Sequence, residues 1–357
     1  MLDVLNLIIR REHNLVSIKD VAKEANVSIA TVSNVVNKTK YVSDELVLRV
    51  EEAIRKLDYN TNVFAKGLKT KKSNIIGLIV HNMNNPLDYE LINGALEAAN
   101  KNSYGLLVFS SEGKIEKEKE ALKSLALKYV DGIILDPIGS KNPEVHKLMN
   151  QGIPIIFAEG YLKGINIKSI LADIKGGTYD AIKHMIGNGH TSIGFVANDS
   201  NTNSSKEAFA GYQKALTEAG IQLMPNLVKT ESSSLNGGYK SICTLMLLDP
   251  RPTAIFVSDH VMTLGAMNAF NQLHINYPAD VAFAGVSDLQ WSAVVKPTLT
   301  VVSPPTKQIG QIAVETLIEI ISGVNTHKNT REYIPVQFVV RESSMNIKPQ
   351  IVPQLAI

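Results

Sequence analysis

The sequence predicts an α/β protein in which a small N-terminal head of three helices precedes a larger body of two lobes with parallel sheets. Three short segments between residues 17 and 57 carry apolar residues at helical spacing. From Ile75 onward, apolar runs alternate with amphipathic segments, a pattern typical of right-handed βαβ units. With 357 residues, the chain is long enough for the head and both lobes.

The head is predicted to follow a helix-turn-helix plan. Ser17 and Asp20 form a capping pair at the start of the first helix. Asn26 tolerates positive φ and breaks that helix, and Ser28 caps the second, over residues 29–36. Ser43 caps a third helix. Two short helices joined by a tight turn and followed by a third make this plan. We assign residues 17–60 to this domain and residues 1–16 to an N-terminal extension.

A lysine-rich segment separates the head from the body. We assign residues 61–74 to a linker, because Gly67 and several lysines lie there and a helix of this length is marginal in water without a partner. Residues 1–72 carry 13 Lys and Arg against 9 Asp and Glu, an excess of four positive charges, whereas the whole chain has a net charge of +2. The basic excess of the head favours a nucleic-acid partner.

The body, residues 75–357, is predicted to divide into two lobes. Continuous apolar runs are typical of parallel strands buried on both faces. We expect strands at 75–80, 106–109, 132–135, 154–158, 192–197, 227–229, 254–257, 281–284, 298–302 and 336–340. This number of strands fits two sheets better than one. We place the N-lobe at about 75–173 and 304–334, and the C-lobe at about 174–303 and 335–357.

Several classes of protein are excluded or disfavoured by what the sequence lacks. No apolar run approaches the ~20 residues of a membrane span. Cys243 is the only cysteine, so no disulfide forms within one chain, and this count suits the cytoplasm. No phosphate-loop, HExxH or GxSxG motif is present, and the histidines lack metal-ligand spacing. We therefore expect no catalytic residue, no cofactor and no metal.

The strongest motif lies in the head. Residues 17–37 read SIKDVAKEANVSIATVSNVVN, and Tyr59, Asn62, Ala65 and Leu68 follow at characteristic positions. This pattern resembles the DNA-binding head of the lactose/galactose-repressor (LacI/GalR) family of bacterial transcription factors. The resemblance continues in the body at residues 76–80, 85–86, 130–134, 210–212, 251–256 and 297–300. It implies a body similar to the periplasmic sugar-binding proteins.

The resemblance implies that the second helix of the head lies in the major groove of DNA, with its N-terminal residues at base edges. Ile29 and Ala30 hold the base-selecting positions, where they are able to contact thymine methyl groups. Asn34 stands where the family usually has arginine, so a guanine contact is weakened there. The expected DNA-binding residues are Ser28, Ile29, Ala30, Thr31, Ser33, Asn34, Asn37, Tyr59, Asn62, Ala65 and Leu68.

The resemblance implies that residues 61–74 contain a hinge helix as well as a linker, because in the family the residues matching 62–68 form this helix when two protomers are bound to DNA. Leu68 matches the leucine that inserts into the minor groove, an insertion that unstacks a base step and bends the duplex. Lys66 and Thr61 replace a frequent arginine and a frequent proline, so the hinge helix is expected to be less rigid here. An alternative for Leu68 is a residue that covers the linker.

The body is expected to bind a small molecule between its lobes, at the carboxyl ends of the strands. Four residues depart from the family here: Leu87 and Asp88 stand where it often has two aromatic residues, Ala208 replaces an arginine and Ser287 an aspartate. The lost arginine weakens the case for an anionic ligand, and the acidic residues favour a neutral polyol or a cationic group. The expected effector-binding residues are Leu87, Asp88, Glu159, Ser204, Ala208, Ser258, Asp259, Ser287, Asp288 and Trp291.

Three functional hypotheses follow from the sequence. The favoured one is a sequence-specific transcriptional regulator, a repressor, that acts as a cytoplasmic homodimer on a near-palindromic DNA operator under control of a small molecule, a sugar or sugar derivative. The alternative is a ligand-binding protein of the periplasmic sugar-binding type without DNA function. The third is an enzyme of doubly wound fold, since fold alone does not decide function. None of the three has a membrane as its partner.

Overall fold

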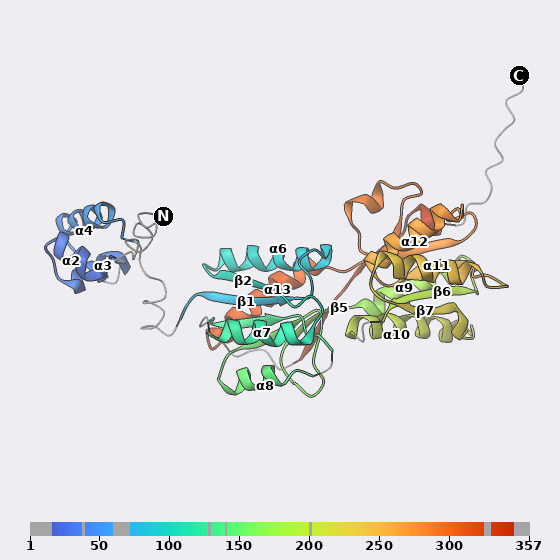
Figure 1. The fold of residues 1–357 in the computed structure, drawn as a ribbon, viewed down its shortest axis with the longest axis horizontal. Helices are drawn as coiled ribbons and strands as arrows, with labels where there is room; N and C mark the ends of the chain where they lie inside the picture. Colours follow the sequence, from blue (N-terminus) through green and yellow to red (C-terminus); the bar gives the residue numbers. More distant parts are fainter. Residues whose placement is uncertain are drawn as a thin grey trace, which may run out of the picture. The chain divides into compact units, whose positions relative to one another are not determined.

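The computed structural model describes residues 16–37, 40–59, 72–127, 130–139, 141–199, 202–324 and 330–345. The chain forms two compact units, which divide between Ser73 and Asn74. Figure 1 shows helices α2, α3 and α4 of the first unit and the sheets and helices of the second.

Within the described residues, the helices of the first unit are α2 (Ile18–Glu24), α3 (Ile29–Asn37) and α4 (Asp44–Lys56). The predicted capping pair is present, because the Ser17 backbone N–H and hydroxyl both donate to Asp20 Oδ2, at 2.8 and 2.6 Å. All three helices contribute to one apolar core, whose fully buried side chains include Val21, Val32 and Val50. The predicted helix-turn-helix arrangement is confirmed.

The first lobe of the body is a six-stranded sheet with helices on both faces. Its strand order is β11-β5-β4-β3-β1-β2, and all pairs are parallel. The strands are β1 (Ile75–Val80), β2 (Gly105–Ser110), β3 (Gly132–Leu135), β4 (Ile155–Ala158), β5 (Ser169–Ala172) and β11 (Arg331–Ile334). Helices α6 (Pro86–Lys101) and α13 (Thr306–Ile321) cover one face, and α7 (Ile115–Leu127) and α8 (Pro143–Asn150) cover the other (Figure 1).

The second lobe repeats this architecture. Its strand order is β12-β10-β9-β8-β6-β7, and only the β10–β12 pair is antiparallel. The strands are β6 (Ile193–Asn198), β7 (Val228–Glu231), β8 (Ala254–Val257), β9 (Ala282–Val286), β10 (Thr300–Ser303) and β12 (Gln337–Val339). Helices α9 (Ile174–Gly187) and α10 (Asn203–Glu218) lie on one face, and α11 (Leu235–Met246) and α12 (His260–Gln272) on the other. Short 3₁₀ turns occupy Pro225–Leu227, Gln290–Ala293 and Glu342–Ser344.

The chain passes between the lobes three times. It crosses after β5 into α9, after β10 into α13, and after β11 into β12. The helix α13 therefore belongs to the first lobe although it follows the last parallel strand of the second. Three adjacent connections make a hinge, since each must change its backbone angles if the lobes move.

Two strands were not predicted from the sequence, β5 and β11, and they pair with each other at one edge of the first sheet. Each has only four residues, and β11 is polar. Strand β11 has charged side chains in place of an apolar run, and its Glu332 Oε2 forms an ion pair of 2.7 Å with Lys168 Nζ. Strand β5 is buried, but its apolar run is confined to Ile170–Ala172. An edge strand faces solvent on one side and does not need a continuous apolar run.

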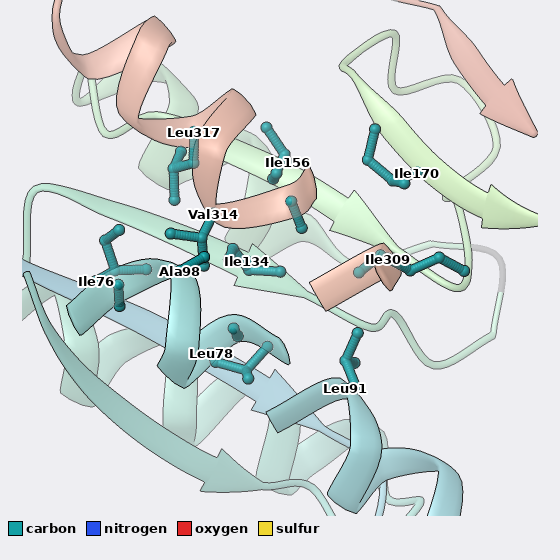
Figure 2. Close-up of a cluster of buried hydrophobic side chains, with 14 of the residues drawn as sticks. Ile76, Leu78, Leu91, Ala98, Ile134, Ile156, Ile170, Ile309, Val314 and Leu317 are labelled. Atoms are coloured by element: carbon teal, nitrogen blue, oxygen red, sulfur yellow. The ribbon is translucent and has the colours of Figure 1, made fainter. Parts of the chain in front are cut away.

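The core of the first lobe lies between the sheet and the α6–α13 pair. Figure 2 shows Leu91 and Ala98 of α6 and Ile309, Val314 and Leu317 of α13 among the side chains of β1, β3, β4 and β5. The two helices touch backbone to backbone, because Gly94 leaves no room for a side-chain carbon against the Lys307 carbonyl oxygen. Among the described residues, no helix is both long and apolar enough to cross a membrane.

Candidate functional site

The N-terminal end of α3 presents the residues that we expected at DNA base edges. Val32 is fully buried in the head core, so the helix is fixed with Ile29 and Ala30 outward. Ile29 is 46% exposed, so its side chain is accessible to a partner. Thr31, Ser33 and Asn34 are half-buried along the same helix.

Two contacts hold the start of α3 in place. The Ser28 hydroxyl accepts a hydrogen bond from the Thr31 backbone N–H at 3.1 Å and lies 2.8 Å from the Thr31 hydroxyl, so Ser28 caps the helix as predicted. The Arg49 guanidinium of α4 donates to the carbonyl oxygens of Ala25 and Asn26, at 2.7 and 3.2 Å. Asn26 has a φ of 50°, in the left-handed region that the sequence predicted for the turn.

The remaining expected DNA-binding residues fall partly outside the described residues. Tyr59 is half-buried and packs against the head core, with its backbone N–H bonded to the Ile54 carbonyl at 3.0 Å. The side chain of Asn37 and all of Asn62, Ala65 and Leu68 lie outside the described part of the chain, together with the hinge helix.

In the body, a pocket of about 420 Å³ opens beside the hinge. Leu87 and Glu90 of α6 line it from the first lobe, and residues 287–290 line it from the second. Between them lies the connection that runs from Ser303 into α13, including Thr306. Of the expected effector residues, the pocket therefore collects Leu87, Ser287 and Asp288. A molecule bound here touches both lobes and one of the three connections between them.

Next to the hinge, four carboxyl groups gather at the carboxyl ends of the first-lobe strands. Asp136 follows β3, Glu159 follows β4, Asp88 lies in the first turn of α6 and Glu118 on α7. Asp88, Glu118 and Asp136 are at most 7% exposed. Burial raises the pKa of all four, and their mutual repulsion raises those of Asp136 and Glu159 further. The pKa of Glu159 rises to about 8.

The four carboxyls differ in how well they are satisfied. Glu118 accepts from the Ile138 N–H at 2.7 Å and the Asn142 amide at 2.5 Å, and Asp88 accepts from the Asn82 N–H at 2.6 Å. Asp136 Oδ2 lies 3.5 Å from His81 Nδ1. Glu159 Oε1 is buried and has no hydrogen-bond partner.

Three residues in this region are strained or unsatisfied. Glu159 and Ser287 have φ values of 59° and 79°, a region that costs a residue with a side chain about 1–3 kcal/mol. The hydroxyls of Ser287 and Thr306 are buried in the hinge pocket and also lack partners. Strained and unsatisfied groups of this kind concentrate at binding sites.

The second lobe engages several other expected effector residues in its own structure. Asp259 caps α12 by accepting from the Val261 and Met262 N–H groups, and it also binds Asn198 and Ser233. The Ser258 hydroxyl donates to the Val196 carbonyl. Asp288 pairs with Arg341 at 2.7 Å, so its charge is balanced.

The last three expected effector residues have no polar contact that identifies a ligand site. Ala208 is 1% exposed within the apolar core beneath α9 and α10. Trp291 packs against the apolar core on the other face of that sheet. Ser204 is exposed near the start of α10.

The sequence analysis missed four residues that the fold brings to this site, His81, Glu118, Asp136 and Thr306. His81 and Asp136 directly follow the apolar runs of β1 and β3. A polar residue at the end of a buried parallel strand was the available signal, because such ends meet at one edge of the sheet.

Comparisons with known proteins decide the family. A model of bacterial regulatory proteins of the lacI family matches residues 17–62, and a periplasmic binding protein-like domain matches residues 182–344. The ribose operon repressor of Haemophilus influenzae is 30% identical over 334 residues, which are 94% of this chain and 100% of the relative. The chain belongs to the lacI family. It is a DNA-binding transcriptional repressor of this family.

One further relative and one solved structure of the lacI family are similar to this chain over nearly its whole length. The HTH-type transcriptional repressor PurR of Aliivibrio salmonicida is 31% identical over 92% of this chain and 99% of its own length. A crystal structure of the lac repressor dimer bound to operator and the anti-inducer ONPF matches with a TM-score of 0.83 at 26% identity, over 92% of this chain and 99% of that chain.

Proposed function

We propose that this lacI-family repressor acts as a homodimer on a near-palindromic operator in the cytoplasm, and that a sugar or sugar derivative bound between its lobes controls its affinity for DNA. The observation that carries the proposal is the hinge pocket, which both lobes and the β10–α13 connection line together. A ligand in that position has different contacts in different lobe arrangements, which is the requirement for a population shift.

The head supports the DNA half of the proposal. Its α3 exposes Ile29 and Ala30 at an N-terminus held by Ser28 and Arg49, and short helices of this kind read the major groove. A two-fold dimer presents two such heads to two half-sites, so each head is able to remain small. The lac repressor structure is itself a dimer bound to operator.

The body supports the effector half. Pocket-lining side chains that bear hydroxyl, amide and carboxylate groups suit a hydroxylated ligand better than an apolar one. Effector binding fixes one arrangement of the lobes and of the three connections, which changes the separation of the linkers that lead to the two heads. Operator affinity then changes, because both heads must fit their half-sites at the same time.

The DNA half is tested by gel shift with the full chain and DNA from upstream of its own gene. We expect specific binding that weakens steeply with salt, because lysine and arginine contacts with phosphates release counterions. Leu68→Ala is expected to weaken specific binding and leave effector binding intact. Equal operator affinity of the variant and the wild type would rule out the hinge-helix role of Leu68.

The effector half is tested by a thermal-shift screen of sugars on the same preparation, followed by gel shifts with any ligand that raises the melting temperature. A ligand that stabilises the body without changing operator affinity would contradict the control mechanism. A body that binds sugar in a protein that ignores DNA would favour the periplasmic-type alternative.

A further inference from the structure

The buried carboxyls at the ends of β3 and β4 lack a sufficient counter-charge in the structure. Within the described residues, the ion pair of the group is the one between Asp136 and His81, and its 3.5 Å separation is long. Lys119 lies near Glu118 but is bonded to the exposed Glu116. Burying a carboxylate without a cation nearby costs free energy. These groups are therefore either protonated or stabilised by a positively charged ligand.

Glu118 is excluded from this role because both of its oxygens already accept hydrogen bonds from Ile138 and Asn142. Three carboxyls remain with acceptor capacity. Asp88 uses one oxygen for the Asn82 N–H, Asp136 uses one for His81, and Glu159 Oε1 has no partner. Asp136 and Glu159 directly follow the neighbouring parallel strands β3 and β4, and Asp88 lies in the helix that follows β1, the other neighbour of β3, so the three meet at one edge of the sheet.

A second, independent observation links these carboxyls to the hinge pocket. The Thr306 side chain is 4% exposed, lines the pocket and lies near enough to Glu159 to lower its pKa. Its hydroxyl has no hydrogen-bond partner, and neither has that of Ser287, which is 1% exposed in the same pocket. A buried hydroxyl without a partner is unfavourable, and a ligand with hydrogen-bond donors and acceptors removes that cost.

The chemistry of the carboxyls selects the ligand. An anion is repelled. Within the described residues, no group of three or more acidic, histidine or cysteine side chains has the geometry to hold a metal ion. A neutral sugar leaves the three carboxyls to share protons. An ammonium group instead brings a positive charge and three hydrogen-bond donors to carboxyl oxygens that are able to accept further hydrogen bonds.

We infer that the effector of this repressor is an aminated sugar, whose protonated amine binds among Asp88, Asp136 and Glu159 while its hydroxyl groups pair with Ser287 and Thr306 in the hinge pocket. This inference rests on the proposed effector function and adds that the effector carries a positive charge. The other charged groups that face the pocket are Glu90, Lys307, which pairs with Glu97, and Asp288, which pairs with Arg341. The two paired groups therefore present little net charge to a ligand.

The test uses matched sugars that differ in one substituent. Calorimetry on the full chain compares D-glucosamine, D-galactosamine and D-mannosamine with their N-acetyl forms and with the parent hexoses, at pH 7. We expect one of the three amino sugars to bind at least 10-fold more tightly than its N-acetyl form and than its parent hexose. Acetylation keeps the ring and removes the charge, so the comparison isolates the ammonium group.

Variants test the residues. Asp136→Asn is expected to remove most of the preference for the amine, while Glu116→Gln, an exposed acid on α7, retains it as the control. Circular dichroism establishes that both variants are folded, and Glu159→Gln is the second variant if Asp136→Asn does not fold.

The outcomes separate the inference from the proposed function. A parent hexose that binds as tightly as its amine overturns the inference and leaves the proposed sugar effector standing. No binding by any free amine also overturns it, and operator binding by the same preparation shows that the repressor is intact. An amine preference that survives both Asp136→Asn and Glu159→Gln contradicts the assigned carboxyls.

Discussion

The Arg49 guanidinium of α4 donates to the Ala25 carbonyl oxygen at 2.7 Å, across the turn that joins α2 to α3. It also reaches the Asn26 carbonyl at 3.2 Å. A side chain of the third helix therefore holds the loop from which the DNA-facing helix begins. The contact joins two parts of the head that are 24 residues apart in the sequence.

We expect Arg49→Met to destabilise this turn by about 1–3 kcal/mol, because hydrogen bonds to a charged group are worth more than neutral ones. Amide hydrogen exchange in α2 and α3 of the full chain should accelerate, and operator affinity should fall. Arg55→Met is the matched control, since Arg55 is an exposed residue of the same helix and its loss changes the charge equally. Equal effects of the two variants would mean that charge, not position, matters.

The close approach of α6 and α13 gives a second prediction. Gly94→Ala places a methyl group against the Lys307 backbone, which is unable to move without shifting α13. We expect a loss of stability of at least about 2 kcal/mol. In contrast, Gly187 in the last turn of α9 has open space around it, so Gly187→Ala should be neutral or stabilise by up to about 1 kcal/mol.

Thermal or denaturant unfolding of the full chain, followed by circular dichroism in the absence of ligand, measures both glycine variants. Similar stability of Gly94→Ala and wild type would show that the helices separate easily. This result would contradict a rigid first lobe, on which the hinge mechanism depends.

The strands that the sequence predicted were those with continuous apolar runs, such as Ile75–Val80 and Ala254–Val257. Their burial on both faces leaves a clear pattern in the sequence. Strand β5 is buried, but its apolar run is confined to Ile170–Ala172. Strand β11 lacks this pattern because it lies at a polar edge, where Arg331 stacks on the Tyr161 ring at 3.4 Å. Single-sequence periodicity carries no information about such a contact.

The candidate site was predictable only in part, for a similar reason. Glu159 and Asp88 were predicted because they occupy positions that the family uses. Asp136 and Glu118 join them only through the parallel order of β1, β3 and β4 and the packing of α7 against that sheet. Their proximity across the fold, not their residue type, makes them a group.

The buried carboxyls predict an unusual dependence of stability on pH. Burial raises the pKa of Glu159 to about 8, whereas the unfolded chain ionises it near 4.5. Between these values the folded protein retains a proton that the unfolded chain has lost, so stability falls as pH rises and levels off above about pH 8. Asp88, Glu118 and Asp136 act in the same direction because their pKa values are also raised.

The window from pH 7 to pH 8 isolates this effect. The lowered pKa values of His184, His190 and His260 act below their usual range near 6.5, and the raised pKa values of the tyrosines act above 10. We expect wild-type stability to fall by up to about 1.4 kcal/mol per pH unit for each proton lost. Glu159→Gln should flatten this slope, whereas Glu97→Gln should not, because Lys307 lowers the pKa of Glu97. If Glu159→Gln leaves the slope of stability against pH unchanged, a group other than Glu159 has the raised pKa.

Base selection by α3 gives the last prediction. Ile29 stands 46% exposed at the start of the helix and has only methyl and methylene groups to offer a base edge. Ile29→Gln introduces an amide that is able to pair with adenine, so preference should move toward adenine at one position of each half-site by about 1–3 kcal/mol. Selection from a randomised operator library, compared between variant and wild type, measures this shift.

Leu127→Gln is the control for this library experiment, since Leu127 is an exposed residue of the body and is 79% exposed. Its substitution should leave the selected operator unchanged. If Ile29→Gln lowers affinity for every operator equally, with no change in base preference, then Ile29 supports the helix but does not read DNA. A change confined to one symmetric pair of base positions instead assigns Ile29 to those bases, and the two-fold repeat follows because each half-site contacts one copy of α3.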